Sequence, residues 1–351
     1  MRVVIVAAPL SARSGVYRST TELVAAARAR GLDWRAELGM RADAPGTPVR
    51  GAAGITEWKA DAHGLRVRAE IRRAVSRAIQ AADVVITMTP QSDLAVSGLV
   101  RSSRAVHVAW VRGLPWPGRN EQTPVRRGQL WAASRWALGR ADAVWATTPL
   151  LQREIRSVGR AAVVPAGIPL RPRMHDGIES GPLIFAGRLS VEKNPQLVVD
   201  VARACGRTTR IAGDGPLAAR LRATATDHVA LTGWADPDEL WRVPGTFVCP
   251  SFREAFGRSA VEAAGTGHPV VLSSRTGVAP LLIRDSDLAD RFVLPPDALD
   301  RWCDAVRSLD ADPALRRRLS DHVSHNARLL STESSLDAAL SALEPLLRRN
   351  P

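Results

Sequence analysis

The chain has 351 residues, which is enough for two domains of ordinary size, each with its own core. A hydrophobic content of 45% and a charged content of 24% are typical of globular proteins, and no apolar run approaches the roughly 20 residues that span a bilayer. The formal charge is +13, but arginines are scattered along the whole chain without a basic ribbon interleaved with aromatic residues, so no nucleic-acid partner is expected.

Short apolar runs alternate with helical stretches from end to end. Apolar residues three and four apart, as at Val67, Ile71 and Val75, mark the helices. Continuous apolar strands between such helices predict parallel sheets covered on both faces, and hence an α/β fold with two Rossmann-like, doubly wound domains. The strands are predicted at 3–8, 84–88, 106–111, 143–146, 162–164, 183–186, 210–212, 229–231, 247–249, 270–272 and 292–294.

The alternation of strands and helices breaks once, where proline, glycine and arginine accumulate between residues 165 and 182. Such a composition is typical of a connection between domains. We predict a first domain over residues 1–168, a linker over 169–182 and a second domain over 183–332. The last segment, 333–351, is predicted to form an amphipathic helix with leucines on one side at 336, 340, 343 and 347.

Four loops of the second domain follow predicted strands and carry glycines or charged residues. In an open parallel sheet, ligands bind at the carboxyl ends of the strands, so all four loops are expected to line one edge. This convergence predicts a single ligand site. The loops are Gly187-Arg188, Gly213-Asp214-Gly215-Pro216, Thr232-Gly233-Trp234 and Ser251-Phe252-Arg253-Glu254.

One of these loops leads to Lys193, one of only two lysines in a chain with 46 arginines. Lysine is a compact point charge and arginine a planar fork, so a site that fits a small cation against a phosphate oxygen distinguishes them. Together, Arg188 and Lys193 suit a diphosphate and can stabilise charge on a leaving phosphate. Two alternatives stay open: a helix start in which Glu192 pairs with these cations, or an ordinary surface lysine like Lys59.

Two carboxylates, Glu254 and Glu262, have seven residues between them. If a helix begins near Gly257, Glu254 lies in the loop and Glu262 about one and a half turns into the helix, so they can meet opposite ends of a ligand. Backbone N–H groups of Gly257, Arg258 and Ser259 would face an anion between them. A ribose diol at Glu262 and a hexose hydroxyl at Glu254 are chemically reasonable. The alternative for Glu254 is a residue that caps the helix, and the alternative for Glu262 is an ordinary exposed helical glutamate.

As a set, these motifs resemble the glycogen-synthase-like retaining glycosyltransferases, family 4, which have the GT-B fold. The resemblance covers nearly the whole chain and is strongest from Ala141 to Ala279. It implies an acceptor-side and a donor-side domain facing each other across a cleft, with the last helix packing back toward the first domain. It also implies a nucleotide-diphosphate sugar as donor, a UDP-sugar being favoured, and a small-molecule, natural-product, glycan or lipid acceptor. No cofactor and no metal are expected.

The resemblance assigns a role to each motif residue. Arg188 and Lys193 would hold the donor diphosphate and Glu254 would contact the donor sugar, so these three form the catalytic set. Glu262 would hold the nucleotide ribose. The other donor-binding candidates are Gly187, Gly213, Gly233, Phe256, Gly257, Arg258, Ser259 and the Gly15 of a Ser14-Gly15-Val16 loop.

One departure from the family pattern lies in the first domain. Many members carry a histidine after the fourth strand of this domain, whereas here the strand at 106–111 leads into Arg112. Arg112 would alter the contact with the sugar or phosphate. A catalytically silent relative that only binds a nucleotide-sugar is therefore an alternative, as is a basic nucleic-acid-binding protein.

Aromatic residues mark the predicted acceptor side. Trp110 and Trp116 flank the loop Arg112-Gly113-Leu114-Pro115, and flat apolar faces suit stacking on a sugar. Trp110, Arg112 and Trp116 are therefore the acceptor-side candidates, with a core position as the alternative for both tryptophans. Core positions are also expected for Trp131, Trp136 and Trp145.

The remaining polar features point away from metal and disulfide chemistry. Asp310-Ala311-Asp312 and Asp285-Ser286-Asp287 have a D-x-D spacing, but both are predicted to be turns next to helices. The three cysteines have no paired spacing and fit a reducing cytoplasm, where we expect the protein. Peripheral contact of the basic helix at 66–80 with the inner membrane face is an alternative to solvated arginines. The sequence makes no prediction of the oligomeric state.

Overall fold

The computed structural model describes residues 1–13, 15–48, 53–64, 66–100, 103–113, 116, 122–224 and 227–348. Two compact units make up the fold, which we call the N-terminal unit (Met1–Pro169 with Thr332–Pro351) and the C-terminal unit (Leu170–Ser331). Residues 170–182, predicted as part of a linker, belong to the C-terminal unit, where Met174 and His175 donate backbone hydrogen bonds to the carbonyl of Thr266.

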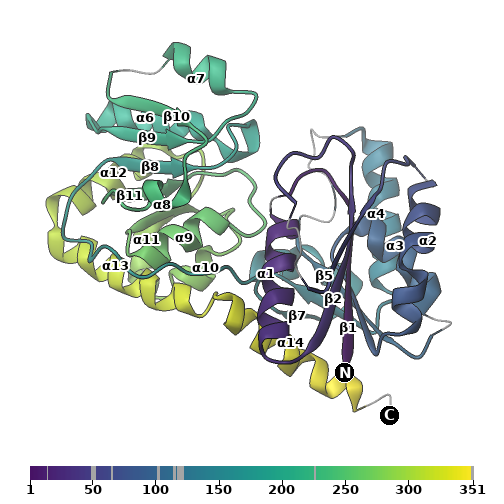
Figure 1. Ribbon diagram of the computed structural model, residues 1–351. Coiled ribbons are helices and arrows are strands. Elements are labelled where there is room, and N and C mark those ends of the chain that lie inside the picture. Colours follow the sequence, from purple (N-terminus) through teal and green to yellow (C-terminus); the bar gives the residue numbers. More distant parts are fainter. Residues whose placement is uncertain are drawn as a thin grey trace. The chain divides into compact units, whose positions relative to one another are not determined.

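The N-terminal unit contains a seven-stranded parallel sheet with the order β3-β2-β1-β4-β5-β6-β7 (Figure 1). All neighbouring strands pair in parallel, as in a doubly wound fold. Its elements are β1 (Arg2–Leu10), α1 (Val16–Ala29), β2 (Asp33–Met40), β3 (Ile55–Lys59), α2 (Arg66–Gln80), β4 (Val84–Thr87), α3 (Pro90–Val100), β5 (Val106–Val111), α4 (Pro124–Leu138), β6 (Ala143–Ala146), α5 (Pro149–Glu154), the 3-10 helix η1 (Arg156–Val158), β7 (Ala161–Val163) and α14 (Thr332–Leu347).

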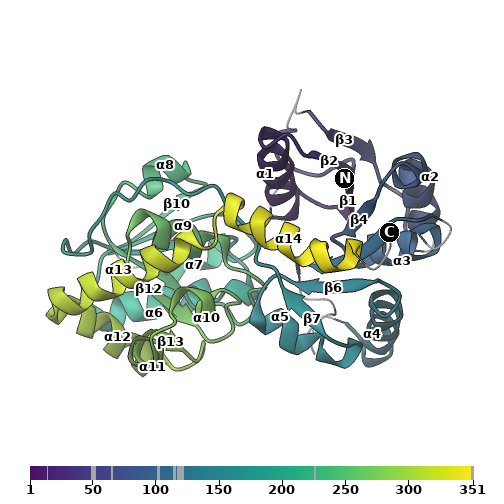
Figure 2. The ribbon, with the colours of Figure 1, turned by 90° about the horizontal axis from the view of Figure 1, so that it is seen from below.

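Alternate residues of β1 enter two cores, one on each face of this sheet. Val3 and Ile5 pack in a core with residues of α1 and with Leu336 and Leu343 of α14. Val4 packs in the other core, with residues of α2 and α3. Both faces of β1 are therefore covered, which explains why its sequence is continuously apolar. Figure 2 shows α14 beside the rest of this unit, although it is distant in sequence.

The C-terminal unit contains a six-stranded sheet with the order β10-β9-β8-β11-β12-β13, again with every pair parallel. On it, α6 packs against α12, and α9 packs against α13. Its elements are β8 (Leu183–Ala186), the 3-10 helix η2 (Val191–Lys193), α6 (Pro195–Cys205), β9 (Thr209–Ala212), α7 (Ala218–Thr224), β10 (Val229–Gly233), α8 (Pro237–Leu240), β11 (Thr246–Cys249), α9 (Arg258–Thr266), β12 (Val270–Ser273), α10 (Ala279–Leu282), α11 (Ser286–Phe292), β13 (Val293–Leu294), α12 (Leu299–Ala311) and α13 (Pro313–Arg328).

The predicted fold class is confirmed: each unit is a Rossmann-like domain built on an all-parallel sheet. A strand lies at every position where an apolar run predicted one, but β2 and β3 were not predicted. β2 alternates apolar residues with Arg35 and Glu37, and most of β3 is only half-buried. Within the described ranges, no helix is long and apolar enough to cross a membrane.

Candidate functional site

The predicted ligand loops of the C-terminal unit meet at one edge of its sheet. β8 is the strand at which the order reverses, because β9 and β10 continue on one side of it and β11 and β12 on the other. Ligands of doubly wound sheets bind at the carboxyl ends of the strands beside such a reversal. The loops after β8 and β11, which carry Lys193 and Glu254, lie at this point.

Backbone hydrogen bonds join three of these loops directly. The N–H of Leu189 donates to the carbonyl of Asp214 at 2.9 Å, and the N–H of Gly213 donates to that of Gly233 at 2.6 Å. Gly213 has a φ of 140°, and a Cβ there would lie 1.8 Å from the carbonyl oxygen of Gly187. Only glycine allows this approach. The glycines at 187, 213 and 233 thus hold the loops together.

Lys193 and Glu254, 61 residues apart, form an ion pair across the point of reversal. The lysine side chain is 25% exposed and the glutamate side chain 19% exposed. Burial favours the neutral amine, but the adjacent Glu254 carboxylate outweighs it and raises the pKa of Lys193 above its ordinary value. The partner of Lys193 is thus Glu254 rather than Glu192, and the lysine stays charged while it is still accessible to a ligand.

Two backbone arrangements position this pair. Asn194 follows Lys193 in the left-handed conformation (φ 52°), and its Nδ2 donates to the carbonyls of Pro250 at 3.2 Å and Pro296 at 2.8 Å. On the other side, Glu254 forms a short parallel bridge with Thr276. We did not single out Asn194 in the sequence, although an asparagine before a proline at a helix start is a signal for such a turn.

Arg188 is an exposed side chain in the loop after β8. Burial favours the neutral acid at Glu192, but hydrogen bonds and the nearby charges of Lys193 and Arg188 hold the pKa of Glu192 below its ordinary value. Both cations therefore contribute to the electrostatic field at this edge. Arg188 differs from Lys193 in that the solvent reaches it freely.

The helix expected after Gly257 is present as α9, with Gly257 as its N-cap at a φ of 107°. Glu254 therefore lies in the loop and is not the cap residue. In the first turns of the helix, Nε of Arg258 lies 3.0 Å from Oε1 of Glu262, whose side chain is 12% exposed. Glu262 is thus a half-buried, paired carboxylate and not an exposed helical glutamate. Ser259 is half-buried on the same first turn.

Phe256 lies between the two carboxylates, Glu254 and Glu262, in the sequence of this segment. Its side chain is half-buried, and its carbonyl accepts a hydrogen bond from the N–H of Val278 at 2.9 Å. At Gly257, a Cβ would lie 2.9 Å from Cγ2 of Thr276, so the chain also needs a glycine here for space. The loop after β12 thus fixes the entry into α9.

Gly15 and Arg112, two candidates of the N-terminal unit, are connected at the start of α1. Gly15 is the N-cap of α1, and its carbonyl accepts a hydrogen bond from Oγ of Ser19 at 3.0 Å. The same hydroxyl accepts from Nη2 of Arg112 at 2.7 Å. Arg112 is 9% exposed, and its guanidinium lies 4.5 Å from the centre of the Trp110 ring. Arg112 therefore reaches the Gly15 turn through Ser19, a residue that sequence reasoning did not identify.

Trp110 is a correction to the predicted acceptor side. It is 1% exposed, its Nε1 donates to the carbonyl of Val164 at 3.0 Å, and its ring meets that of Trp145 edge to face. A ring enclosed in this way cannot stack on a sugar, so Trp110 is a core residue. Trp116 is half-buried and keeps its place as a candidate, while Ser14, Leu114 and Pro115 lie outside the described residues.

Two further tryptophans contradict the prediction that they are core residues. Trp131 and Trp136 on α4 are 41% and 50% exposed. Arginines cover their rings, with Arg135 5.6 Å from the centre of Trp131 and Arg140 4.4 Å from that of Trp136. Cation–π contact accounts for aromatic rings on a wet surface. Trp145, in contrast, is buried as predicted.

The aspartates with D-x-D spacing shape helix ends. Asp312 caps α13 by accepting from the N–H of Leu315 at 2.9 Å, and Asp285 caps α11 in the same way. Asp310 pairs with Arg207. Across the part of the chain that the structure describes, no three His, Cys, Asp or Glu side chains are grouped closely enough to hold a metal ion.

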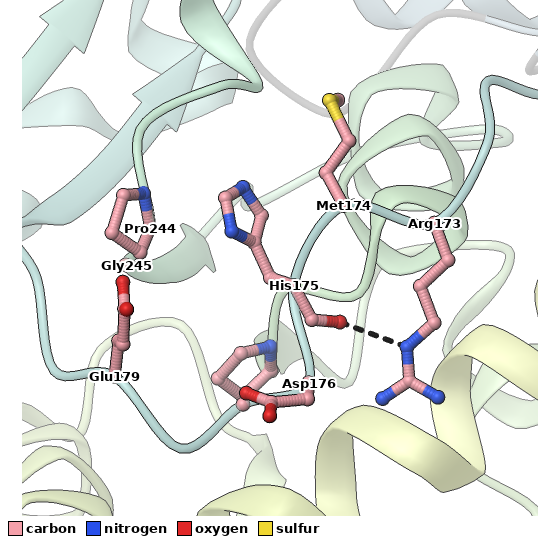
Figure 3. A pocket seen from close by; sticks show the side chains of 9 residues that line it. Arg173, Met174, His175, Asp176, Glu179, Pro244 and Gly245 are labelled. Atoms are coloured by element: carbon pink, nitrogen blue, oxygen red, sulfur yellow. Dashed lines mark hydrogen bonds between the residues drawn. The ribbon is translucent and has the colours of Figure 1, made fainter.

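A cavity of about 490 Å³ in the C-terminal unit lies at the opposite end of the strands (Figure 3). Its lining includes Pro244 and Gly245, which precede β11, and Pro269, which precedes β12. In Figure 3 the Nε of Arg173 donates to the carbonyl of His175 at 2.8 Å. None of the predicted donor residues lines this cavity, so it is separate from the candidate site.

Two Rossmann-like units with all-parallel sheets are the architecture of the GT-B fold, which solved glycosyltransferase structures share with this chain. Residues 181–312, within the C-terminal unit, match the family model described as "Glycosyl transferases group 1". This match contains every candidate residue of the C-terminal unit. The predicted resemblance to GT-B glycosyltransferases is confirmed, while retention of configuration stays a prediction.

Relatives and solved structures agree with this assignment. The chain is 30% identical over 221 residues to a GDP-mannose-dependent α-(1-6)-phosphatidylinositol dimannoside mannosyltransferase of Mycobacterium tuberculosis, covering 56% of each chain. The chain thus spans about half the length of the curated relatives it matches. It has the fold of a sucrose-phosphate synthase of Thermosynechococcus elongatus (TM-score 0.81, 17% identity, 100% of both chains). It also has that of the Anabaena protein HepE in complex with UDP-glucose (TM-score 0.75, 15% identity, 98% and 100% covered).

Proposed function

We propose that this protein is a retaining glycosyltransferase whose donor is a nucleotide-diphosphate sugar, with a UDP-sugar favoured. The observation that carries the proposal is the partly exposed Lys193–Glu254 pair at the reversal point of the C-terminal sheet. A cation that would meet phosphate and a carboxylate that would meet sugar hydroxyls lie side by side there. The family match over residues 181–312 supports the same activity.

Each charged group has a part in this proposal. Arg188 and Lys193 would neutralise the donor diphosphate and the charge that grows on it as the sugar leaves, without a metal ion or another cofactor. Glu254 would accept hydrogen bonds from hydroxyls of the transferred sugar. Glu262 would accept from the ribose diol, with Arg258 holding its carboxylate in place.

In the proposed reaction, a hydroxyl or amine of the acceptor attacks the anomeric carbon on the face from which the diphosphate leaves. The bond from the anomeric carbon to the phosphate oxygen breaks, and a bond to the acceptor oxygen or nitrogen forms. The acceptor proton passes to the leaving phosphate. The protein contributes positioning and charge stabilisation. We place the reaction in the cytoplasm, at the membrane face if the acceptor is a lipid.

A nucleotide panel tests the donor assignment. UDP, GDP, ADP and TDP are compared by thermal shift and calorimetry on the wild type, Glu262→Ala and Glu262→Gln, with Glu333→Ala, an exposed glutamate of α14, as the control. We expect UDP to bind selectively. Glu262→Ala should weaken it by about 1.5–3 kcal/mol, because charge-assisted hydrogen bonds to the ribose are lost.

The outcomes separate the alternatives. If no nucleotide binds while DNA or RNA binds with a steep salt dependence, the protein is a nucleic-acid-binding protein and the proposal fails. If UDP binds but UDP-sugars are neither transferred nor slowly hydrolysed, the protein is a silent nucleotide-sugar binder. If the Glu262 variants bind UDP as the wild type does, Glu262 is not the ribose ligand.

A further inference from the structure

A second cavity, of about 410 Å³, lies in the N-terminal unit and contains none of the candidate site residues. Arg2 at the start of β1, Arg35 on β2 and Thr56 on β3 line it, together with Arg28 near the end of α1. It therefore lies at the amino ends of these strands, near the chain end marked N in Figure 1. Its volume is within the range of small-molecule sites.

Three guanidinium groups of this cavity share one carboxylate. Nε of Arg2 and Nε of Arg35 each lie 2.9 Å from an oxygen of Asp33, and Nη1 of Arg28 lies 3.9 Å away. Asp33 neutralises at most one of the three cations, and Glu37, whose carboxyl group also lines the cavity, at most one more. The cavity therefore keeps an excess of positive charge that an anionic ligand can balance.

The donor groups are suited to a phosphoryl group. Within the described residues, Arg35 bonds only through its Nε, which leaves its two Nη nitrogens as donors for a ligand. A guanidinium presents its N–H groups as a fork that matches two oxygens of a phosphate. Asp33 accepts hydrogen bonds from Arg2 and Arg35, which restricts these side chains before a ligand binds.

Polar groups of a different kind line the same cavity. Glu37 and Thr56 contribute a carboxyl group and a hydroxyl, and Val4 and Ala78 add an apolar surface. Burial raises the pKa of Glu37, against the effect of a hydrogen bond from Thr56. A bare phosphate would use only the arginine side of this cavity. A polyol that carries a phosphoryl group would use both the arginine side and the side formed by Glu37 and Thr56.

We propose that this cavity binds a small phosphorylated polyol, with its phosphoryl group at Arg28 and Arg35 and its hydroxyls at Glu37 and Thr56. The positive charge comes from three arginines held by one aspartate, and the cavity has room for more than a phosphate ion. The site is independent of the proposed donor site, because it lies in the other unit and at the opposite ends of the strands from the Gly15 turn.

Calorimetry on the full chain tests this proposal with glucose 6-phosphate, inorganic phosphate and glucose as probes, in KCl of matched ionic strength. We expect glucose 6-phosphate to bind at least tenfold more tightly than phosphate, and glucose to give no signal. Arg35→Gln and Arg28→Gln should each weaken glucose 6-phosphate at least tenfold. Arg73→Gln, which removes an exposed arginine of α2, should leave binding unchanged, as should Lys193→Ala in the other unit.

Three results would overturn the proposal. Equal affinity for phosphate and glucose 6-phosphate would remove the polyol part and leave an anion site. An equal loss with Arg73→Gln would show that the net charge of the surface, and not this cavity, attracts the ligand. Loss of binding in Lys193→Ala would place the phosphate in the donor site. Circular dichroism of the half-exposed Arg35→Gln variant checks that it is folded.

Discussion

The two units have the same doubly wound fold, but the reversal points of their sheets differ in charge. In the N-terminal unit this point lies between β1 and β4, and neutral groups close it: the hydroxyls of Thr89 and Ser92 donate to the carbonyl of Ala8 at 2.6 and 3.1 Å. In the C-terminal unit it lies between β8 and β11 and carries Lys193 and Glu254.

In the proposed reaction, this difference would separate binding from chemistry within one fold. A hydroxyl bonded to a carbonyl gives no net charge, so the N-terminal edge can shape a ligand's surroundings without stabilising a charge that develops in a reaction. A partly exposed cation next to a carboxylate can do so, because an approaching anion redistributes its hydrogen bonds. In the N-terminal unit, Arg112 is instead buried against Trp110 and Ser19, and Arg13, in the loop after β1, is paired with Glu57.

The largest effect is expected at the charged edge. Lys193→Ala should lower kcat about 100- to 1,000-fold and the affinity for the donor by less than tenfold, because the lysine meets charge that grows in the transition state. Steady-state kinetics with the donor found by the nucleotide panel measure both. Lys59→Ala is the matched control, since it removes the only other lysine of the chain, at the end of β3.

Glu254→Gln sharpens this prediction. It removes the negative partner of Lys193 and keeps the shape of the side chain, so donor affinity should be preserved while turnover falls through the contact with the sugar.

If Lys193→Ala lowers kcat/KM through KM alone, the lysine only binds the donor and the edge has no special part in the chemical step.

Sequence reasoning predicted this charged edge better than the neutral one. Parallel strands bring their carboxyl ends together, so the loops at 187–193 and 251–254 had to lie side by side. The pairing of Lys193 with Glu254 was beyond prediction, because Glu192 is the nearer carboxylate in sequence. Asn194, which turns the chain at this point, is what presents the lysine to the second loop.

The errors at the tryptophans have a common cause. Both faces of a parallel sheet are covered, so β5 is buried along its whole length and its mostly apolar sequence does not show that Trp110 points into a core. On α4, Trp131 and Trp136 were predicted to be core residues, but arginines beside them form the cation–π contacts that stabilise exposed rings. Periodicity identifies elements and does not report what covers them.

The response to acid should also distinguish the units, with an effect on the order of 3 kcal/mol per histidine. Burial lowers the pKa of His107 in the N-terminal unit and of His268 in the C-terminal unit to about 4. Each is neutral when folded, so unfolding takes up a proton below pH 6.5 and stability falls from there to about pH 4. In the N-terminal unit, burial raises the pKa of Asp93 to about 7. Unfolding releases a proton from Asp93 below pH 7, so this group makes the folded unit more stable as the pH falls over the same range.

We therefore expect the C-terminal unit to lose stability between pH 7 and pH 5 while the N-terminal unit changes little. Hydrogen exchange measured by mass spectrometry and corrected for intrinsic rates follows each unit separately. His268→Gln should remove most of the loss in the C-terminal unit. His107→Gln should make the N-terminal unit more stable at pH 5 than at pH 7, because Asp93 then acts alone; equal losses in both units would contradict this balance.

The smallest effect is expected at Arg112, where it tests whether the neutral edge is structural. Its guanidinium both bonds to Ser19 and lies over Trp110, and a lysine cannot reproduce the planar fork. Arg112→Lys should lower the free energy of unfolding by about 1–2 kcal/mol, measured by urea denaturation, and leave donor affinity within twofold of the wild type. Arg73→Lys, at an exposed position of α2, is the control for replacing an arginine with a lysine. If Arg112→Lys instead leaves stability unchanged and abolishes transfer, Arg112 contacts the substrate, and the N-terminal edge takes part in the reaction that we assign to the C-terminal one.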